Sequence, residues 1–125
     1  MLQQFNRGEI WLATDKENKN GSVQTMFNRP VVILQNNMGN RFSPTITILP
    51  LTSQRNKKWL PTHVTLYKTK NLNSLSTVLV EQITTISKEK LTRFIGSVDL
   101  SEMLDIENAV LIQCGISPRN NIAYA

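Results

Sequence analysis

Short apolar runs, each ended by polar residues, glycine or proline, recur through the first two thirds of the chain. Runs of four or five aliphatic or β-branched residues are too short for typical helices and are characteristic of strands. In the fourth run polar and apolar residues alternate, so we expect Val64 and Leu66 to face the core and Thr65 and Tyr67 to face outward. The pattern predicts five strands, at residues 10–13, 31–34, 46–49, 62–67 and 76–80.

Prolines mark the expected limits of two of these strands. Pro30 comes just before the second run, and a proline is tolerated at the first position of a strand because its missing N–H is not needed there. Pro50 is expected to end the third run. Arg29 would then lie at the mouth of a rigid strand, where a cation can be held in place, although an arginine at this point can equally be a solvated flank.

Polar segments separate the strands. Residues 15–28 contain Gly21 and several amides and predict a long loop, and residues 37–43 predict a turn. A loop of this length in a compact domain is usually functional or disordered. A second polar loop carries Arg55, Lys57, Lys58 and Trp59.

Two helices are expected after the strands. Ser87 is a candidate N-cap for a short helix at 88–93, with Gly96 soon after it. Asp99 and Glu102 have the spacing of a capping box at the start of a longer helix, at about 100–114.

The longer helix has one apolar face and a defined end. Gly115 should terminate it, and residues 116–125 should form a loose tail. The single cysteine is expected to be a small core residue. The residues that follow helical spacing, and should pack on the sheet, are Met103, Ile106, Val110 and Cys114.

Strands first and a closing helix last predict one mainly β domain of the α+β class, a small antiparallel barrel with a short helix and a C-terminal helix. The 125 residues suffice for a single domain, whose core we expect at about 7–115. With 40% hydrophobic and 18% charged residues the composition is that of a globular protein. The chain has no apolar run long enough for a membrane helix and no apolar stretch typical of a signal peptide, so we expect it in the cytoplasm.

The net charge of +5 is unevenly distributed. Residues 1–70 hold ten Lys/Arg and three Asp/Glu, a net of +7, whereas residues 71–125 hold four and six, a net of −2. A basic front half suggests a face for a polyanion such as a nucleic acid. Many basic domains bind nothing acidic, so the charge alone leaves both readings open.

Familiar catalytic signatures are missing from the sequence. One cysteine and one histidine exclude an internal disulfide and a zinc site rich in these residues, and we expect neither a metal nor a cofactor. If the protein is an enzyme, we expect its catalytic groups to be arginine and hydroxyl side chains. If the second and third strands form a hairpin, Arg29 and Thr52 lie close together, where a guanidinium fork and a hydroxyl could hold a phosphate.

Five segments, in order and at matching spacing, resemble the MazF/PemK/Kid toxins, bacterial endoribonucleases of toxin–antitoxin pairs. The segments are RGEIW at 7–11, RPVVILQN at 29–36, GNRFSPT at 39–45, LPTHV at 60–64 and VEQITTI at 80–86. The resemblance implies an SH3-like barrel, a homodimer, and an antitoxin partner whose acidic, disordered tail covers the RNA groove. It also implies metal-independent cleavage of single-stranded mRNA at a short sequence, leaving 2′,3′-cyclic phosphate and 5′-hydroxyl ends.

The resemblance also assigns site residues. It makes Arg29 and Thr52 the catalytic pair, and it implies RNA contacts at Ser22, Gln24 and Gln82. Charge beside an aromatic face suits Lys57, Lys58 and Trp59 to RNA, although Trp59 could instead be a hydrophobic plug. His63 is a further candidate RNA contact, although within an alternating strand it could instead be structural.

The sequence departs from the family pattern in the 23–28 segment and at Thr84, where relatives commonly have arginine, and this puts the cleaved sequence in doubt. Two alternatives stay open. A gyrase-binding toxin of the CcdB type shares the fold but does not need the Arg29/Thr52 pair, and a non-catalytic relative could bind RNA or only sequester antitoxin.

Overall fold

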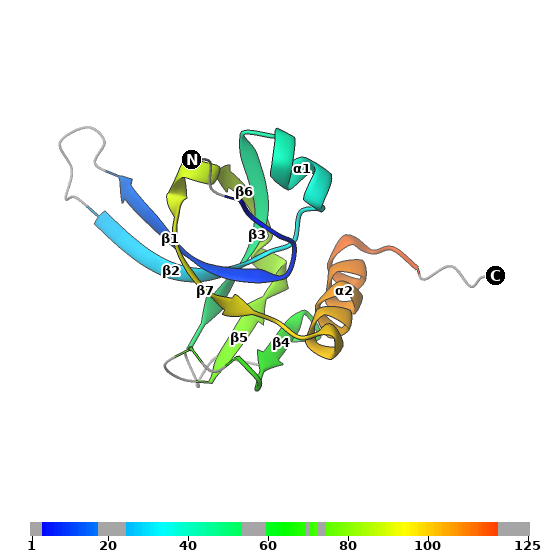
Figure 1. The fold of residues 1–125 in the computed structure, drawn as a ribbon. Helices are drawn as coiled ribbons and strands as arrows, with labels where there is room; N and C mark the ends of the chain where they lie inside the picture. The colour runs from blue at the N-terminus through cyan, green and yellow to red at the C-terminus, as the bar shows by residue number, and fades with distance from the viewer. Residues whose placement is uncertain (1–3, 18–24, 54–59, 70, 73–74, 118–125) are drawn as a thin grey trace.

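The computed structural model describes residues 4–17, 25–53, 60–69, 71–72 and 75–117. Its strands are all antiparallel where they pair, in the order β4-β5-β3-β2-β1-β7, with β6 also paired to β3 (Figure 1). The predicted mainly β, α+β class is confirmed. The sheet is strongly curved and barrel-like, but within the described residues its path does not close between β4 and β7. The strands are β1 (Glu9–Glu17), β2 (Thr25–Ile33), β3 (Thr45–Thr52), β4 (His63–Leu66), β5 (Ser76–Leu79), β6 (Thr84–Ser87) and β7 (Leu91–Ser97).

The first hairpin is longer than the apolar pattern indicated. β1 and β2 pair from Ile10↔Val32 out to Glu17↔Thr25, so much of the predicted 15–28 loop is strand. The expectation that Arg29 lies at a strand mouth and Pro30 at a first position is therefore wrong, because both lie inside β2. Pro30 is tolerated because β3 begins to pair with β2 only at Val31, which leaves one side of Pro30 without a ladder.

β3 does not stop at Pro50, as the sequence suggested, but continues to Thr52. On one side Pro50 lies opposite Val31 of β2. On the other side β3 changes partners, from β6 at Ile48 to β5 at Leu51, and Pro50 lies between the two. A proline at such a change of partner has no ladder bond to lose there.

The predicted 37–43 turn is instead helix α1 (Asn37–Phe42). The Asn36 side chain caps it by accepting a hydrogen bond from Gly39 N–H at 2.8 Å. The buried Asn40 side chain donates to Gln35 O and to Asn37 Oδ1. Side-chain amides thus hold a segment whose intrinsic helix propensity is low.

The helix predicted at 88–93 is only a single 3-10 turn, η2 (Lys88–Lys90), which the Ser87 side chain caps as expected. Residues from Leu91 onward instead form β7, which pairs with β1 about 80 residues earlier. The short strand β6 and the 3-10 turn η1 (Val80–Gln82) were not predicted. Long-range pairing overrides a local helix signal here.

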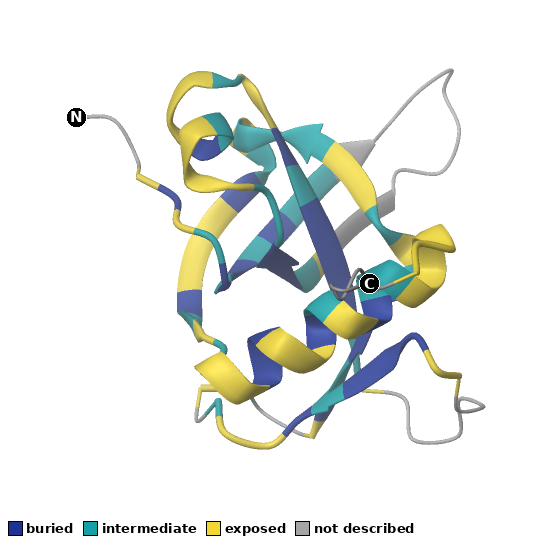
Figure 2. Cartoon of the chain, turned by 90° about the vertical axis from the view of Figure 1, so that its right-hand side faces the viewer, coloured by how far each residue is buried: buried dark blue, intermediate teal, exposed yellow. Residues whose placement is uncertain are grey.

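Helix α2 (Leu100–Cys114) confirms the predicted capping box, and Gly115 ends it in the left-handed region at φ 68°. Met103 and Ile106 are buried against the sheet, as expected, and Ala109 joins them (Figure 2). Cys114 is exposed, so its prediction as a core residue is wrong. Residues 112–117 are all exposed, so the described part of the chain does not cover the end of α2.

Two apolar clusters lie on opposite faces of the central strands. One lies under α2 and the β4–β5 hairpin and includes Ile10, Val32 and Leu49. The other includes Trp11, Val31 and Ile48, together with Phe5 and Leu91. In β4, Val64 and Leu66 are buried and Tyr67 beyond it is exposed, as the alternation predicted. None of the helices described is long and apolar enough to cross a membrane.

Candidate active site

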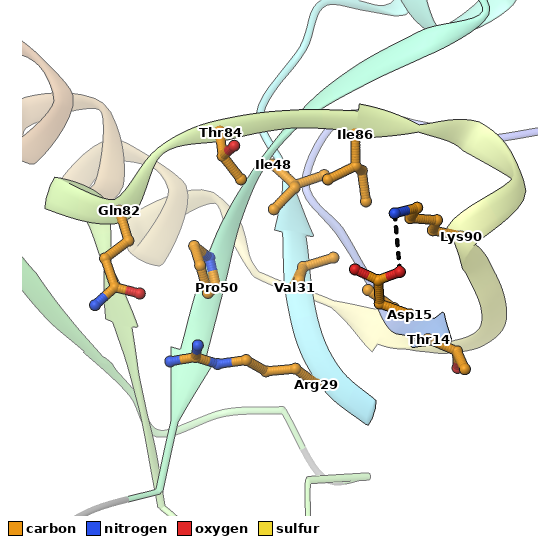
Figure 3. Close-up of a pocket in the computed structure, with 11 residues that line it drawn as sticks. Thr14, Asp15, Arg29, Val31, Ile48, Pro50, Gln82, Thr84, Ile86 and Lys90 are labelled. Carbon is orange, nitrogen blue, oxygen red and sulfur yellow. Dashed lines mark hydrogen bonds and ion pairs between the residues drawn. The ribbon is translucent and has the colours of Figure 1, made fainter. Parts of the chain in front are cut away.

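A pocket of about 230 Å³ opens where the second apolar cluster reaches the surface (Figure 3). The apolar part of its lining consists of Ala13, Val31, Ile48, Pro50 and Ile86. The polar part consists of Thr14, Asp15, Arg29, Gln82, Thr84 and Lys90. Six polar side chains around an apolar depression are the arrangement expected of a binding site.

Arg29 is positioned by both neighbours of β2. It lies opposite Ala13 of β1, and its Nε–H donates to Leu51 O of β3 at 3.0 Å. That bond involves Nε, the guanidinium nitrogen nearest the main chain, and fixes the direction in which the two terminal nitrogens point. The two terminal nitrogens point toward the Gln82 side of the pocket (Figure 3).

Thr52 is the last residue of β3 and is half-buried. The β2–β3 pairing runs from Ile33↔Ile48 to Val31↔Pro50, and beyond it the Arg29 side chain reaches the carbonyl oxygen of Leu51, the residue before Thr52. The hairpin that the sequence required for this pair is therefore present. Thr52 does not line the pocket itself, but it directly follows Leu51, whose carbonyl oxygen binds Arg29.

Gln82 is exposed at the end of η1 and lines the pocket. The neighbouring Glu81 anchors this turn to β4. Its carboxylate accepts a hydrogen bond from Thr62 Oγ1 at 2.9 Å and lies 2.9 Å from His63 Nε2. Burial by itself would raise the pKa of Glu81, but the bonds from His63, its own backbone and Thr62 outweigh this, and the net pKa is lowered.

His63 is buried, with 4% of its side chain exposed. Leu60 N–H donates to His63 Nδ1 at 3.3 Å, so the ring proton lies on Nε2 and is donated to Glu81. Both ring nitrogens are thereby engaged within the protein. The placement matches the structural alternative for His63. A direct contact of His63 with RNA would require the contacts with Leu60 and Glu81 to break.

Asp15 of β1 and Lys90 of η2 form an ion pair at the other end of the pocket, with Oδ1 and Nζ 2.9 Å apart (Figure 3). The sequence predicted Asp15 to begin the 15–28 loop and assigned Lys90 no role in a site. The two residues are 75 positions apart, and no local pattern signals their contact. Thr84, which the sequence singled out only as a departure from the family pattern, reaches the pocket because β6 pairs with β3.

Several predicted RNA contacts lie outside the described residues, namely Ser22, Gln24, Lys57, Lys58 and Trp59. Of the predicted site residues that are described, Arg29 and Gln82 line the pocket, Thr52 follows the Leu51 that binds Arg29, and His63 is buried in contact with Glu81. In the described part of the chain no three His, Cys, Asp or Glu side chains form a group that could hold a metal ion.

Comparison with known proteins gives a consistent result. The chain is 39% identical over 114 residues to the endoribonuclease MazF of Staphylococcus epidermidis, covering 90% of this chain and 93% of that protein. The fold matches an endoribonuclease from a mycobacterial species with a TM-score of 0.75 and 22% identity, covering 94% and 97% of the two chains. It also matches a mycobacterial endoribonuclease in complex with its cognate antitoxin, with a TM-score of 0.71, 22% identity and 94% and 99% coverage.

The family assignment rests on the sequence match, because a structural match at 22% identity shows only the fold. A model of the PemK-like, MazF-like toxins of type II toxin–antitoxin systems matches residues 6–114, nearly the whole described chain. The five segments singled out in the sequence lie within that range. This chain is therefore a member of the PemK/MazF toxin family.

Proposed function

We propose that this protein is the toxin of a toxin–antitoxin pair and a sequence-specific endoribonuclease that cleaves single-stranded mRNA without a metal ion. The observation that carries the proposal is the Arg29 guanidinium, held by Leu51 O with its terminal nitrogens directed into a pocket. Family membership and the 39% identical endoribonuclease support the same activity.

The proposed reaction is an internal transesterification followed by release. The ribose 2′-hydroxyl loses its proton, its oxygen bonds to the adjacent phosphorus, and the bond from phosphorus to the 5′-oxygen breaks. The leaving oxygen takes up a proton. The products are a 2′,3′-cyclic phosphate and a 5′-hydroxyl.

Arg29 is suited to the charge that develops in this reaction. A guanidinium can donate two parallel hydrogen bonds to phosphate oxygens, and these strengthen as the phosphorane gains negative charge. It stays protonated near neutral pH and is a poor base, so we assign it charge stabilisation. Thr52, which follows the Leu51 that binds Arg29, would fix a phosphate oxygen by a hydroxyl hydrogen bond.

The remaining contacts extend along the RNA. Gln82 at the pocket rim would hydrogen-bond the substrate, and the basic, aromatic 57–59 segment would hold phosphates and unstacked bases. Ser22 and Gln24 are proposed as further contacts with the RNA. We further propose that the protein acts in the cytoplasm as a homodimer. Its proposed antitoxin carries an acidic tail, because the +7 net charge of residues 1–70 favours an acidic partner.

The first test uses purified protein, long single-stranded RNA and excess EDTA, with the new ends mapped by sequencing and their chemistry determined. Discrete cuts with cyclic-phosphate and 5′-hydroxyl ends are expected. A folded protein that makes no cuts would refute the proposal and favour a gyrase-binding or non-catalytic toxin.

The matched test of the site replaces one arginine at a time. Arg29→Ala should abolish cleavage, by at least about a hundredfold in rate, because the charge stabilisation is lost. Arg41→Ala removes the same charge from exposed helix α1, away from the pocket, and should cleave at the wild-type rate. Both variants should keep the wild-type circular dichroism spectrum. Wild-type cleavage by a folded Arg29→Ala variant would show that the catalytic assignment is wrong.

A further inference from the structure

The backbone hydrogen bonds at the end of β2 show which of its residues face which neighbouring strand. Leu34 N–H, just after β2, donates to Thr47 O of β3 at 3.0 Å. One residue earlier, Ile33 O accepts from Gly8 N–H at 2.8 Å, on the β1 side. Successive residues of a central strand direct their backbone groups to opposite neighbours. The even-numbered residues of β2 therefore direct their N–H and C=O groups toward β3, and the odd-numbered residues direct theirs toward β1.

Pro30 stands where this series requires a donor. Hydrogen-bonded positions in an antiparallel pair recur at every second residue, so they continue through Val32↔Leu49 and would next join residue 30 to Leu51. Residue 30 is a proline, which has no N–H, and the pairing with β3 ends just before it, at Val31. Leu51 is 2% exposed, and a buried carbonyl oxygen left without a donor is costly.

Arg29 supplies the donor that Pro30 lacks. Its Nε–H donates to Leu51 O at 3.0 Å, and this bond sets the direction of the two terminal nitrogens. Figure 3 shows these nitrogens turned toward Gln82, within the pocket. A backbone N–H at position 30 would approach the same carbonyl oxygen and compete with the guanidinium for it. The side chain of Arg29 can therefore take this bond because the next residue has no N–H.

We propose that Pro30 is a positioning residue for Arg29, which leaves Leu51 O to the Arg29 Nε–H and thereby directs the guanidinium into the pocket. Pro30 acts here only through the arginine. The effect on the reaction rate rests on the proposed ribonuclease function, in which Arg29 stabilises the charge on the phosphate. A misplacement of about 1 Å in an active site can lower a rate about a hundredfold. A guanidinium that is present but less well directed should lose less, about tenfold.

Two replacements of Pro30 separate the missing N–H from the proline ring. Pro30→Ala adds an N–H at this position. Lactic acid at position 30, introduced by nonsense suppression, has the same side chain as alanine but an ester in place of the amide, so the N–H is absent again. Pro44→Ala is the matched control, because it removes an exposed proline that lies before β3 and outside the pocket. Melting curves verify that each protein is folded.

The first measurement is the exchange of the Arg29 Nε–H with water, followed by NMR in ¹⁵N-labelled protein without RNA. The resonance is assigned by its absence from Arg29→Ala. A hydrogen bond protects an N–H from exchange. We expect slow exchange in the wild-type protein, the lactic acid variant and Pro44→Ala. In Pro30→Ala the exchange should be at least about tenfold faster.

The second measurement is the kinetics of cleavage of single-stranded RNA. Pro30→Ala should lower kcat about tenfold and change KM by less than about twofold, because contacts with RNA away from Arg29 are kept. The lactic acid variant and Pro44→Ala should have the wild-type kcat. Recovery of the rate with the ester would assign the effect to the N–H, since the ring is absent from both replacements of Pro30.

Three results would overturn the inference. Equally slow exchange in folded Pro30→Ala would show that a backbone N–H does not displace Arg29 from Leu51 O. Fast exchange in the folded lactic acid variant would show that the missing N–H does not hold the arginine, and this result is decisive even where Pro30→Ala does not fold. Faster exchange with an unchanged kcat in Pro30→Ala would show that the direction of Arg29 does not matter to the reaction.

Failure of the proposed function would look different. A wild-type protein that makes no cuts in RNA would refute the ribonuclease activity. The exchange of the Arg29 Nε–H is measured without RNA, so it still decides whether Pro30 positions the guanidinium.

Discussion

Glu102 is the residue whose replacement should reveal most about how α2 is attached to the sheet. The residue is 4% exposed, and its carboxylate makes three hydrogen bonds to backbone N–H groups. One oxygen accepts from Tyr67 at 2.8 Å and Lys68 at 3.2 Å, just after β4. The other accepts from Asp99 at 3.3 Å and completes the capping box. One carboxylate thus caps the helix and joins it to the end of a strand.

The expected loss can be estimated from these bonds. A hydrogen bond to a charged group contributes about 1.5–3 kcal/mol, and the bond at 2.8 Å falls in that class. The capping interaction adds about 1 kcal/mol. Solvent can partly replace the carboxylate, because Tyr67 and Lys68 are exposed. We therefore expect Glu102→Ala to lower the free energy of unfolding by about 2–4 kcal/mol. Glu102→Gln, which keeps the size and one acceptor, should lose about half of that amount.

Urea unfolding at one fixed protein concentration measures this quantity, because any self-association would make stability concentration-dependent. Fluorescence follows Trp11, which lies in the second apolar cluster and becomes exposed on unfolding. Asp105→Ala is the control, since it removes an exposed carboxylate from the same helix and should change stability by less than about 0.5 kcal/mol. If Glu102→Ala is as stable as Asp105→Ala, the reasoning that this carboxylate holds α2 to β4 is wrong.

Two further predictions concern the carboxylates of Asp99 and Glu81. The pKa of Asp99 is lowered from its ordinary 3.8 to about 2, first by the Glu102 N–H and then by Lys68, so its stabilising contribution is complete above pH 3.8 and is lost as the pH falls through about 2. Asp99→Asn should therefore flatten the pH dependence of the urea midpoint between pH 4 and 2, and an unchanged slope would contradict this. In Glu81→Gln the amide NH₂ would replace a carboxylate oxygen that faces His63 or Thr62. This should lower the free energy of unfolding, measured in urea, by about 1–3 kcal/mol. It should also raise the KM for RNA, because η1 then holds Gln82 less firmly; unchanged stability and KM would show that this network does not position the turn.

The sequence by itself determined the features whose signals lie within a few residues of one another. The capping box of Asp99 and Glu102 and the terminating Gly115 were predicted correctly, because helix ends are satisfied by neighbouring groups. Aliphatic runs located the buried centres of five strands, because burial on a sheet requires them. Five segments between residues 7 and 86, in order and at matching spacing, indicated the family, which the match over residues 6–114 confirmed.

The tertiary structure alone decided what depends on contacts between distant residues. Residues 91–97 form a strand because β1 is available to pair with them, and Arg29 lies inside a strand because polar residues extend the first hairpin. The Asp15–Lys90 pair joins positions 75 apart, and the His63–Glu81 pair joins positions 18 apart. Chain folding brings such groups together through pairing and packing of whole strands, and a local pattern of residue types contains no information about which distant strand will be the neighbour.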